Sequence, residues 1–477
     1  MKIINFRKTF LSCISLALAC GMQAQSYTWI SSSEGNYWKQ NTVKLQKKVP
    51  VVSDLEVNNK DSVATFKAWG TCFNELGWDA LNMLSTNQKE NILKQLFSPN
   101  GEMHFTIGRL SMNANDYARN WYSCDEVDGD FQLKQFNIER DKQALIPYIK
   151  SAQKYNPDMT FWISPWSPPN WMKINHHYAN KSGKFNDLPK EKEVPLYEND
   201  QVIQDSRYLQ AYALYFCKFI DAYKEQGIPI TTVMYQNEAY SFTEYPGCSW
   251  TADGTIRFNS EYLAPTLAKL HPEVELFLGT INTNHLDVIE KILSDSKMQK
   301  CIKGVGFQWE GGQILPKIRA KYPNYSYVQS ESECGWGKFD WSAAEHTFGL
   351  INHYLSNGCE KYTFWNAILC DKGMSSWGWS QNALIRVDSQ TKTATYTPEY
   401  YAVKHYSHYV IPGSRLLGYK ESAADKKAIL IFLTPQNKYV VIAGNFNNGS
   451  QRLTLKLGER YLDVTLAAHS FNTFQMK

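Results

Sequence analysis

Several patterns that would indicate familiar chemistry are missing from the 477-residue sequence. No run of Lys and Arg exceeds two or three residues and the formal net charge is only +4, which argues against a nucleic-acid partner. The ten Cys residues form no CxxC pair, the adjacent His176 and His177 have no partners at ligand spacing, and no Gly-rich phosphate loop is present. We therefore expect neither a bound metal nor a cofactor.

Long apolar runs are also absent beyond the N-terminus, so we expect no segment that spans a bilayer. The N-terminus itself is typical of an export signal, because positive residues precede an apolar run at 10–19 and a cleavage site stands before Gln25. Cys20 lies in a lipoprotein-like context and is a candidate for a lipid anchor. We expect a signal peptide at 1–24 and a periplasmic, secreted or cell-surface protein. Export permits disulfides, but the Cys spacing gives no connectivity.

Aromatic residues are abundant, at 14% of the chain, with 15 Trp, 29 Tyr and 23 Phe. Most of them must fill a large core, and the rest are available for a binding site. Flat aromatic faces suit carbohydrate, because sugar rings present apolar C–H faces and ligand pockets are commonly lined by aromatic side chains. The length of the chain allows one large barrel with a small companion domain.

An alternation of strand-like and helix-like patterns runs through the middle of the chain. Short apolar runs predict eight strands, at 66–70, 104–109, 160–164, 231–235, 275–279, 304–308, 325–330 and 362–366. Periodic apolar positions between them predict helices at 80–96, 140–155, 206–225, 259–270, 286–293, 314–321 and 343–355. Eight strands with intervening helices favour an α/β fold with a closed parallel (β/α)8 barrel over an open sheet.

The pattern changes after Pro412. Runs at 428–434, 439–444, 452–456 and 461–466 predict strands separated by turns, with no helix pattern among them. A β-like run at 42–52 indicates that the N-terminal segment adds strands to the same module. We therefore predict four parts: a signal peptide at 1–24, an N-terminal segment at 25–60, the barrel at 61–408 and a small all-β sandwich at 409–477.

Two short stretches carry the most informative residues, Tyr-Gln-Asn-Glu-Ala at 235–239 and Val-Gln-Ser-Glu-Ser-Glu at 328–333. Each continues a predicted strand to a Glu, Glu238 in one and Glu331 in the other. A carboxylate at the end of a buried strand loses water and needs a compensating reason to be there. Hydrolysis of a glycosidic bond requires two such groups, one to give a proton and one to attack or stabilise the sugar carbon.

The active site of such a barrel lies at the carboxyl ends of its strands. No Ser-His-Asp arrangement is found there. The strand ends instead hold a cation, amides, indoles and the two carboxylates: Arg109, Trp166, Asn237, Glu238, Gln308, Trp309, Glu331 and Trp365.

These residues suggest a division of roles. If the two carboxyl groups lie about 5 Å apart, the mechanism is retaining. Glu331 would then be the nucleophile, held ionised by Arg109, and Glu238 the general acid and later the base, with a raised pKa. Asn237 could bond to the sugar 2-hydroxyl. Glu333, two residues beyond Glu331, is the alternative nucleophile, and three further carboxylates compete: Glu75, Glu310 and Asp371.

Several motifs in order along the chain give it a family resemblance. They are AWGTCFNEL at 68–76, GRLSM at 108–112, DF at 130–131, SPWSPPNWMK at 164–173, QNE at 236–238, QSE at 329–331 and YTPEYY at 396–401. Together they resemble glycoside hydrolase family 30, the retaining group that includes glucosylceramidase and the microbial endo-β-1,6-glucanases. The resemblance implies a (β/α)8 barrel joined to a β-domain built from both termini.

The resemblance also implies roles for particular residues. By position, the acid/base falls on Glu238 and the nucleophile on Glu331. The sugar-binding pair falls on Arg109 and Asp116, and the pocket indoles on Trp166 and Trp365.

The departures from the family pattern are informative too. Gln308-Trp309-Glu310 stands where glucosylceramidase-like members have His-Trp-Tyr. The stretch 370–382 is more similar to the β-1,6-glucanase branch, and its Trp377 is a further candidate substrate-binding residue. We therefore expect an endo-β-1,6-glucanase that acts on a β-linked glucan by double displacement through a covalent glycosyl-enzyme intermediate. The alternatives are an exo-acting β-glucosidase or glucosylceramidase, and, in a different class, a non-catalytic carbohydrate-binding protein on the same scaffold.

Overall fold

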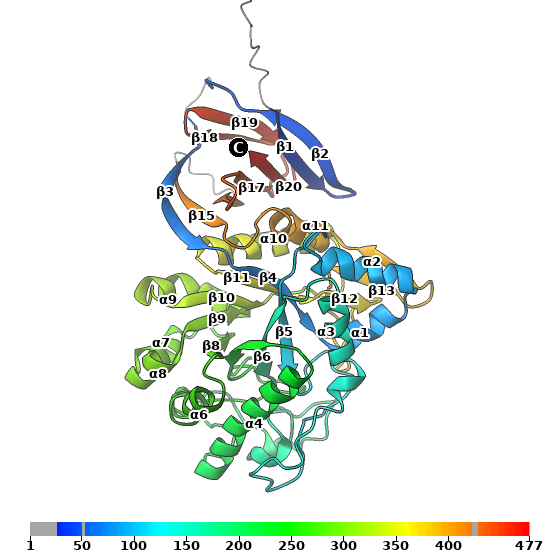
Figure 1. Cartoon of the computed structure of the whole chain (residues 1–477), viewed down its shortest axis with the longest axis vertical. Helices are drawn as coiled ribbons and strands as arrows, with labels where there is room; N and C mark the ends of the chain where they lie inside the picture. Colours follow the sequence, from blue (N-terminus) through cyan, green and yellow to red (C-terminus); the bar gives the residue numbers. More distant parts are fainter. Residues whose placement is uncertain (1–25, 50–52, 422–427, 477) are drawn as a thin grey trace, which may run out of the picture.

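The computed structural model describes residues 26–49, 53–421 and 428–476, which form a barrel and a separate all-β domain (Figure 1). The expected signal peptide at 1–24 and the candidate lipid-anchor residue Cys20 lie outside the described residues. No helix in the described part of the chain is long and apolar enough to cross a membrane. Its eight cysteines are free thiols, and six of them are buried.

Eight parallel strands close into a barrel, in the order β10-β11-β4-β5-β6-β7-β8-β9. They are β4 (Ala68–Phe73), β5 (Ile107–Met112), β6 (Thr160–Pro165), β7 (Ile230–Met234), β8 (Glu275–Ile281), β9 (Gly304–Gln308), β10 (Ser326–Glu331) and β11 (Lys361–Asn366). All eight predicted strands are present, and the predicted (β/α)8 barrel is confirmed. The predictions for β4 and β5 began and ended two to three residues early, which is the usual uncertainty of strand boundaries.

Helices form the outer layer of the barrel. They are α1 (Glu75–Asn82), α2 (Thr86–Phe97), α3 (Leu145–Gln153), α4 (Ser206–Glu225), α5 (Ala252–Arg257), α6 (Ala264–Leu270), α7 (Leu286–Ser294), α8 (Ser296–Cys301), α9 (Leu315–Lys321), α10 (Trp341–Ser356) and α11 (Pro398–Ser407). The prediction of a single helix at 80–96 was wrong, because α1 ends at Asn82 and a second helix, α2, begins at Thr86. Ser85 caps the new helix and forms a capping box with Gln88.

The helix predicted at 259–270 is also more complex than expected. A π-helical segment, Phe258–Leu263, connects α5 to α6 without interruption. The apolar period that predicted one helix therefore covers a change of helical type, which periodicity alone does not resolve.

Nine strands form the β-domain, in the order β19-β18-β3-β15-β16-β17-β20-β1-β2. They are β1 (Ser26–Ser33), β2 (Asn36–Lys44), β3 (Leu55–Thr65), β15 (Arg415–Glu421), β16 (Ala428–Leu433), β17 (Tyr439–Asn445), β18 (Gln451–Leu457), β19 (Arg460–Leu466) and β20 (Ser470–Met476). Strands from both ends of the chain therefore lie side by side, as the blue and red ribbons in Figure 1 show. The predicted N-terminal strand at 42–52 was wrong in its bounds, because β2 ends at Lys44 and β3 begins at Leu55.

The nine-stranded sheet folds over an apolar core of its own. Tyr27 of β1, Val441 of β17 and Leu455 of β18 belong to one buried cluster although their strands are far apart in the sheet. The sheet is fixed to the barrel by aromatic contacts. The ring of Phe471 in β20 stacks on Trp341 and Phe348 of α10, at 4.4 and 4.6 Å between ring centroids.

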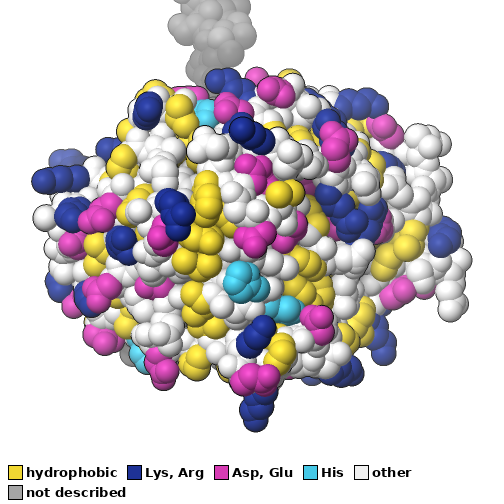
Figure 2. All heavy atoms as spheres, turned by 90° about the horizontal axis from the view of Figure 1, so that it is seen from below, with side chains coloured by type: hydrophobic (Ala, Val, Ile, Leu, Met, Phe, Trp, Pro, Cys, Tyr) yellow, Lys and Arg dark blue, Asp and Glu magenta, His cyan; other side chains and the backbone are white. Residues whose placement is uncertain are grey.

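A third, small sheet lies beyond the end of β11. It consists of β12 (Ile368–Cys370), β13 (Ile385–Asp388) and β14 (Thr393–Tyr396). The loop between β12 and β13 contributes Trp379 and Gln381 to the cavity described below. On the face of the molecule away from the β-domain, Lys and Arg side chains are interspersed with Asp and Glu, and Figure 2 shows no continuous patch of one sign among the described residues.

Candidate active site

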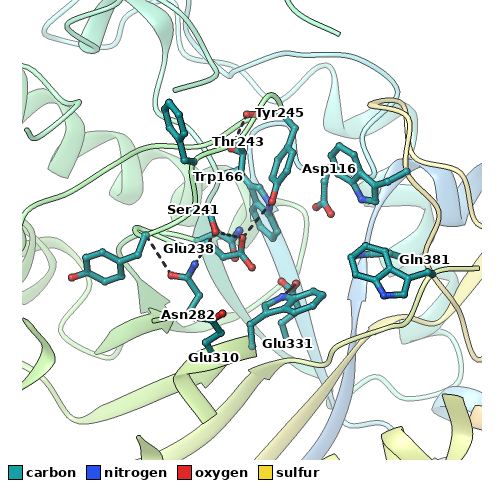
Figure 3. Close-up of a pocket in the computed structure, with 16 residues that line it drawn as sticks. Asp116, Trp166, Glu238, Ser241, Thr243, Tyr245, Asn282, Glu310, Glu331 and Gln381 are labelled. Atoms are coloured by element: carbon teal, nitrogen blue, oxygen red, sulfur yellow. Dashed lines mark hydrogen bonds between the residues drawn. The ribbon is translucent and has the colours of Figure 1, made fainter. Parts of the chain in front are cut away.

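The carboxyl ends of the barrel strands surround a cavity of about 490 Å³. Arg109 comes from β5, Asn237 and Glu238 follow β7, Gln308 ends β9, and Glu331 ends β10. Figure 3 shows the carboxyl groups of Glu238, Glu331 and Asp116 directed into the same space. The strand-end residues selected from the sequence therefore meet at one site.

Glu331 reaches this site through an irregularity in the sheet. Val328 of the same strand packs inside the barrel, so strict alternation along β10 would turn Glu331 to the outer face. The pairing of β10 with β9 shifts register between Gln329 and Glu331. Such a bulge re-aims the side chain that follows it, and here it brings the carboxylate to the mouth of the barrel.

Both oxygens of Glu331 have strong donors. Arg109 Nη1 lies 2.5 Å from Oε2 in an ion pair whose Arg side chain is 0% exposed, and Gln308 Nε2 lies 3.3 Å from the same oxygen. Trp309 Nε1 donates to Oε1 at 3.0 Å. Charge-assisted bonds of this kind stabilise the carboxylate and fix its orientation. Glu331 is thus an oriented carboxylate that lines the cavity.

Arg109 is enclosed by aromatic rings. Its guanidinium lies 4.9, 4.5 and 5.1 Å from the ring centroids of Trp162, Trp166 and Trp365. Cation–π contacts compensate part of the loss of water around a buried cation. Its second nitrogen, Nη2, donates to Asn237 Oδ1 at 2.6 Å, so one guanidinium orients both Asn237 and Glu331.

Glu238 has a different environment, in which the donors are neutral. Ser241 Oγ donates to its Oε2 at 2.8 Å, Tyr245 hydroxyl donates to the same oxygen at 3.4 Å, and Gln308 Nε2 donates to Oε1 at 3.0 Å. Burial raises the pKa of Glu238 to about 7, with the negative charge of Glu331 as the second cause. This carboxyl group therefore holds a proton in mildly acidic and near-neutral solution.

The backbone of Glu238 is held in an uncommon conformation. Its φ is +48°, in the left-handed region that favours glycine. Its backbone N–H donates to Thr280 Oγ1 at 3.1 Å. Strained backbone of this kind is found preferentially at functional sites, where the surrounding structure enforces it.

The two carboxylates lie close together, since both accept a hydrogen bond from the same donor. Gln308 Nε2 lies 3.0 Å from Glu238 Oε1 and 3.3 Å from Glu331 Oε2, so these two oxygens are no more than about 6 Å apart. Retaining glycosidases have carboxyl groups about 5–5.5 Å apart, and inverting ones about 6.5–9.5 Å, to admit a water molecule. The separation in this chain falls on the retaining side.

Asp116 supplies a third carboxyl group to the cavity. It is buried, and its Oδ1 has no hydrogen-bond partner within the described part of the chain. Burial, followed by the charges of Glu331 and Glu238, raises the pKa of Asp116 well above its usual range. A sugar hydroxyl would satisfy this unpaired group.

The loop after β6, which carries Trp166, is fixed by the amine of a buried lysine. Lys173 Nζ donates to Ser167 Oγ and to the carbonyl oxygens of Tyr178 and Gly247, each at 2.8 Å. Burial lowers the pKa of Lys173 to about 7. Three loop segments are thereby tied together behind one wall of the cavity.

Six of the ten site residues predicted from the sequence line the cavity: Asp116, Trp166, Asn237, Glu238, Trp309 and Glu331. Arg109 and Gln308 lie behind this surface and contact it through their hydrogen bonds. Trp365 is fully buried and stacks on Trp166 at 5.3 Å. Trp377 is also buried, and its indole N–H donates to the carbonyl of Asn115.

The competing carboxylates lie elsewhere or have other partners. Glu333 is 2.9 Å from His346 Nε2 in a neighbouring cavity, and Glu75 forms an ion pair with Arg140 at 2.9 Å. Asp371 accepts the backbone N–H of Ser389. Glu310 does line the main cavity. Within the described ranges, no cluster of three His, Cys, Asp or Glu side chains is arranged to hold a metal.

Several lining residues were not identified from the sequence: Tyr240, Ser241, Phe242, Thr243, Tyr245, Asn282, Trp336, Trp379 and Gln381. Five of them follow Glu238 within seven residues. A loop rich in aromatic and hydroxyl side chains, directly after the strand end that carries Glu238, is a sequence signal that could have identified them. Asn282, Trp379 and Gln381 come from other loops, and only the closed barrel brings them to the cavity.

A closed (β/α)8 barrel with two neighbouring Glu side chains at its mouth defines the class of retaining glycoside hydrolases. Residues 66–410 match the glycosyl hydrolase family 30 TIM-barrel domain. The chain therefore belongs to glycoside hydrolase family 30 and is a glycosidase.

Two curated relatives illustrate the range of this family. The chain is 26% identical over 425 residues to the lysosomal acid glucosylceramidase of Mus musculus, covering 83% of this chain and 78% of that protein. It is 23% identical over 448 residues to the endo-1,6-β-D-glucanase neg1 of Aspergillus fumigatus, covering 90% and 86%.

Two solved structures share the fold. SrfJ from Salmonella typhimurium superposes with a TM-score of 0.84 at 21% identity, over 95% of this chain and 100% of SrfJ. The endo-β-1,6-glucanase BT3312 superposes with a TM-score of 0.80 at 20% identity, over 94% and 99%. Both domains of the chain are therefore covered by known structures of the same architecture.

Proposed function

We propose that this chain is an endo-β-1,6-glucanase in which Glu331 is the nucleophile and Glu238 the general acid and base. The observation that carries the proposal is the contact of Gln308 with both carboxylates, which keeps them at a separation suited to double displacement. The unequal environments of the two groups supply the second requirement, an anion beside a proton donor.

In the first step, Glu238 gives its proton to the glycosidic oxygen while an oxygen of Glu331 bonds to the anomeric carbon. The bond from that carbon to the leaving oxygen breaks, which gives a glycosyl ester of Glu331 and a sugar with a free hydroxyl. The contact between Glu238 and its three neutral donors keeps its carboxyl group at the cavity surface.

In the second step, Glu238 takes a proton from water as the water oxygen attacks the anomeric carbon, and the ester bond to Glu331 breaks. The negative charge of Glu331 is absent in the ester, so one of the causes that raise the pKa of Glu238 is removed when the group must act as a base. Asn237 is oriented throughout by donors to its Oδ1 from Arg109, Thr280 and Gln308, which leaves its amide NH₂ to serve the sugar 2-hydroxyl.

Two observations support a preference for the β-1,6 linkage. The stretch 370–382 resembles the β-1,6-glucanase branch, and a relative over most of the chain is named as an endo-1,6-β-D-glucanase. A second candidate is glucosylceramide hydrolysis, since the mouse glucosylceramidase is slightly more identical in sequence. Against it, Glu310 adds a carboxylate to the cavity wall, which is unfavourable for contact with an apolar aglycone.

Product analysis on β-1,6-, β-1,3- and β-1,4-glucans and on glucosylceramide tests the proposal. We expect oligosaccharides of mixed length from β-1,6-glucan, with the β-anomer formed first in NMR spectra. Glucose alone from the start would favour an exo-acting enzyme, and preferential cleavage of glucosylceramide would favour the second candidate. An initial α-anomer would overturn the assigned mechanism.

We also infer export from the N-terminal pattern, with cleavage before Gln25 or lipid attachment at Cys20. Polymeric glucan outside the cell would then be the accessible substrate. Mass spectrometry of the mature N-terminus, together with cell fractionation, distinguishes the two routes. A full-length chain that retains residues 1–24 in the cytoplasm would overturn this inference.

A further inference from the structure

The most exposed large apolar side chain in the described part of the molecule stands at the rim of the active-site cavity. Trp336 is 70% exposed, although it is among the largest apolar residues. Within the described residues, no aromatic ring stacks on it. Exposed apolar surface beside a binding site commonly marks a contact for a ligand.

The loop that carries Trp336 is held in place by its backbone conformation and by contacts with a neighbouring loop. Gly335 and Gly337, on either side, have φ values of +61° and +74°, a conformation that other residues rarely adopt. The backbone N–H of Asn382 donates to the carbonyl of Cys334 at 2.6 Å. A Cβ on Gly337 would lie 2.4 Å from the carbonyl oxygen of Lys372, so the two loops pack closely.

A second cavity of about 360 Å³ lies next to the catalytic one. Trp309 and Trp336 line both cavities, so the two are neighbours along one surface. Trp309 also donates to Glu331, which places the shared wall directly beside the reacting centre.

Six polar side chains are among the residues that line the second cavity. Glu333, Lys338, Asp340 and His346 contribute to its wall, and Glu333 and His346 pair at 2.9 Å. Side chains of this kind form hydrogen bonds with hydroxyl groups, and an alkyl chain would leave them without partners. Two indoles, Trp309 and Trp336, stand among these polar groups, and such a combination matches a sugar ring, with its apolar C–H faces and its rim of hydroxyls.

We propose that the second cavity is a subsite for a further sugar of the same glycan and that Trp336 is its stacking platform. The proposal rests on the glycan-hydrolysing function proposed above and extends it, because it assigns the enzyme a substrate of several linked sugars. A specificity-determining residue of this kind acts on the binding of the chain and leaves the bond-breaking groups in place.

Kinetics of Trp336→Ala on two substrates test the subsite. A β-1,6-linked glucose tetrasaccharide can reach the second cavity, whereas β-glucosyl fluoride has a leaving group of one atom and cannot. We expect kcat/KM for the tetrasaccharide to fall about tenfold more than kcat/KM for the fluoride. Trp336→Phe keeps a flat ring and should recover most of the loss.

The control is Leu270→Ala, at an exposed position at the end of α6 in the outer helical layer. It should leave the ratio of the two kcat/KM values at the wild-type level. An equal fall on both substrates in Trp336→Ala, or no fall on either, would overturn the proposed subsite.

Binding on an inactive background separates this inference from the proposed function. In Glu331→Gln protein, calorimetry should show that Trp336→Ala weakens binding of the tetrasaccharide about tenfold more than binding of glucose. If wild-type protein releases nothing from any β-glucan, the proposed function fails, but this binding difference still decides the role of Trp336.

Discussion

The mouth of the barrel and a cluster in its interior are built from different kinds of residue. In the interior, Trp162, Met234, Phe277 and Val328 form a small cluster of buried apolar side chains, one each from β6, β7, β8 and β10. At the mouth, equally buried positions hold charged and amide groups. Arg109 lies between the two regions, with its guanidinium 4.9 Å from the ring of Trp162.

The difference shows how one scaffold supports both stability and chemistry. The apolar cluster gains free energy from burial. The polar mouth loses free energy through desolvation of its charges, and in return each charge interacts more strongly with its neighbours. Changes at the mouth should therefore alter turnover, and changes in the apolar cluster should alter stability.

The largest effect is expected from Glu331, the proposed nucleophile. Glu331→Gln removes the attacking oxygen anion but keeps the shape of the side chain, so turnover of β-glucan should fall at least about 10⁴-fold. Binding of the glycan and the thermal unfolding profile should stay close to those of the wild type. Substantial residual turnover, less than about 100-fold below wild type, would reassign the nucleophile, with Glu333→Gln as the matched comparison.

The next effect is expected from Glu238, the proposed proton donor. Glu238→Gln should lower turnover of β-glucan about 10²–10⁴-fold, since that is the usual contribution of a positioned general acid. The first step on a glucoside with an activated leaving group needs little proton donation and should be much less affected. Pre-steady-state release of a dinitrophenol leaving group measures this step. An equal loss on both substrates would contradict the assigned role.

In the apolar cluster, Phe277→Ala tests the expected contribution of these side chains to stability. Loss of a buried aromatic ring should lower the free energy of unfolding by about 3–5 kcal/mol. The exposed-surface control, Leu270→Ala, should change it by less than about 0.5 kcal/mol. Denaturant titration measures both. A loss below about 1 kcal/mol for Phe277→Ala would show that this cluster contributes little to folding.

The smallest effect concerns pH. Glu238 must be protonated to act as an acid, and its pKa is raised to about 7, so kcat/KM should fall as pH rises through about 7. The hydrogen bond from Ser241 lowers this pKa, so Ser241→Ala should raise it and move the basic limb of the pH profile to higher pH. Movement to lower pH would show that the Ser241 hydroxyl does not stabilise the ionised form.

The protonation of Glu238 also determines how its contribution to folding stability changes with pH. Burial keeps Glu238 protonated in the folded chain over a pH range in which the unfolded chain has already lost the proton. The unfolded state therefore binds fewer protons, and this group lowers stability as pH rises from the unfolded value of about 4.3 to about 7. The stabilising effect of Glu238→Gln should increase over that interval.

The sequence predicted the barrel because each strand is a short apolar run bounded by helical patterns. It also placed Glu238 and Glu331 at strand ends, Asn237 beside Glu238, and Arg109 and Gln308 at the ends of other strands. It did not predict how Glu331 turns inward, because that depends on a register shift between β9 and β10, which no period along a single strand contains.

Other features depend on contacts between segments far apart in the chain. Trp336 and Asn282 reach the cavity only because loops from different strands converge there. β3 was missed because its sequence, LEVNNKDSVAT, alternates weakly and contains several polar residues. The break between α1 and α2 is different, since Ser85 and Gln88 at capping-box spacing are a local signal that could have been used.

The order of strands in the β-domain has a consequence for synthesis on the ribosome. Both neighbours of β3 in the sheet, β15 and β18, and one neighbour of β1, β20, are translated only after the whole barrel. β3 and one edge of β1 must therefore wait for the last strands, while the barrel between them can close. The final sixty or so residues complete the sheet, and truncation of the C-terminus would leave β3 without either neighbour and β1 paired only with β2.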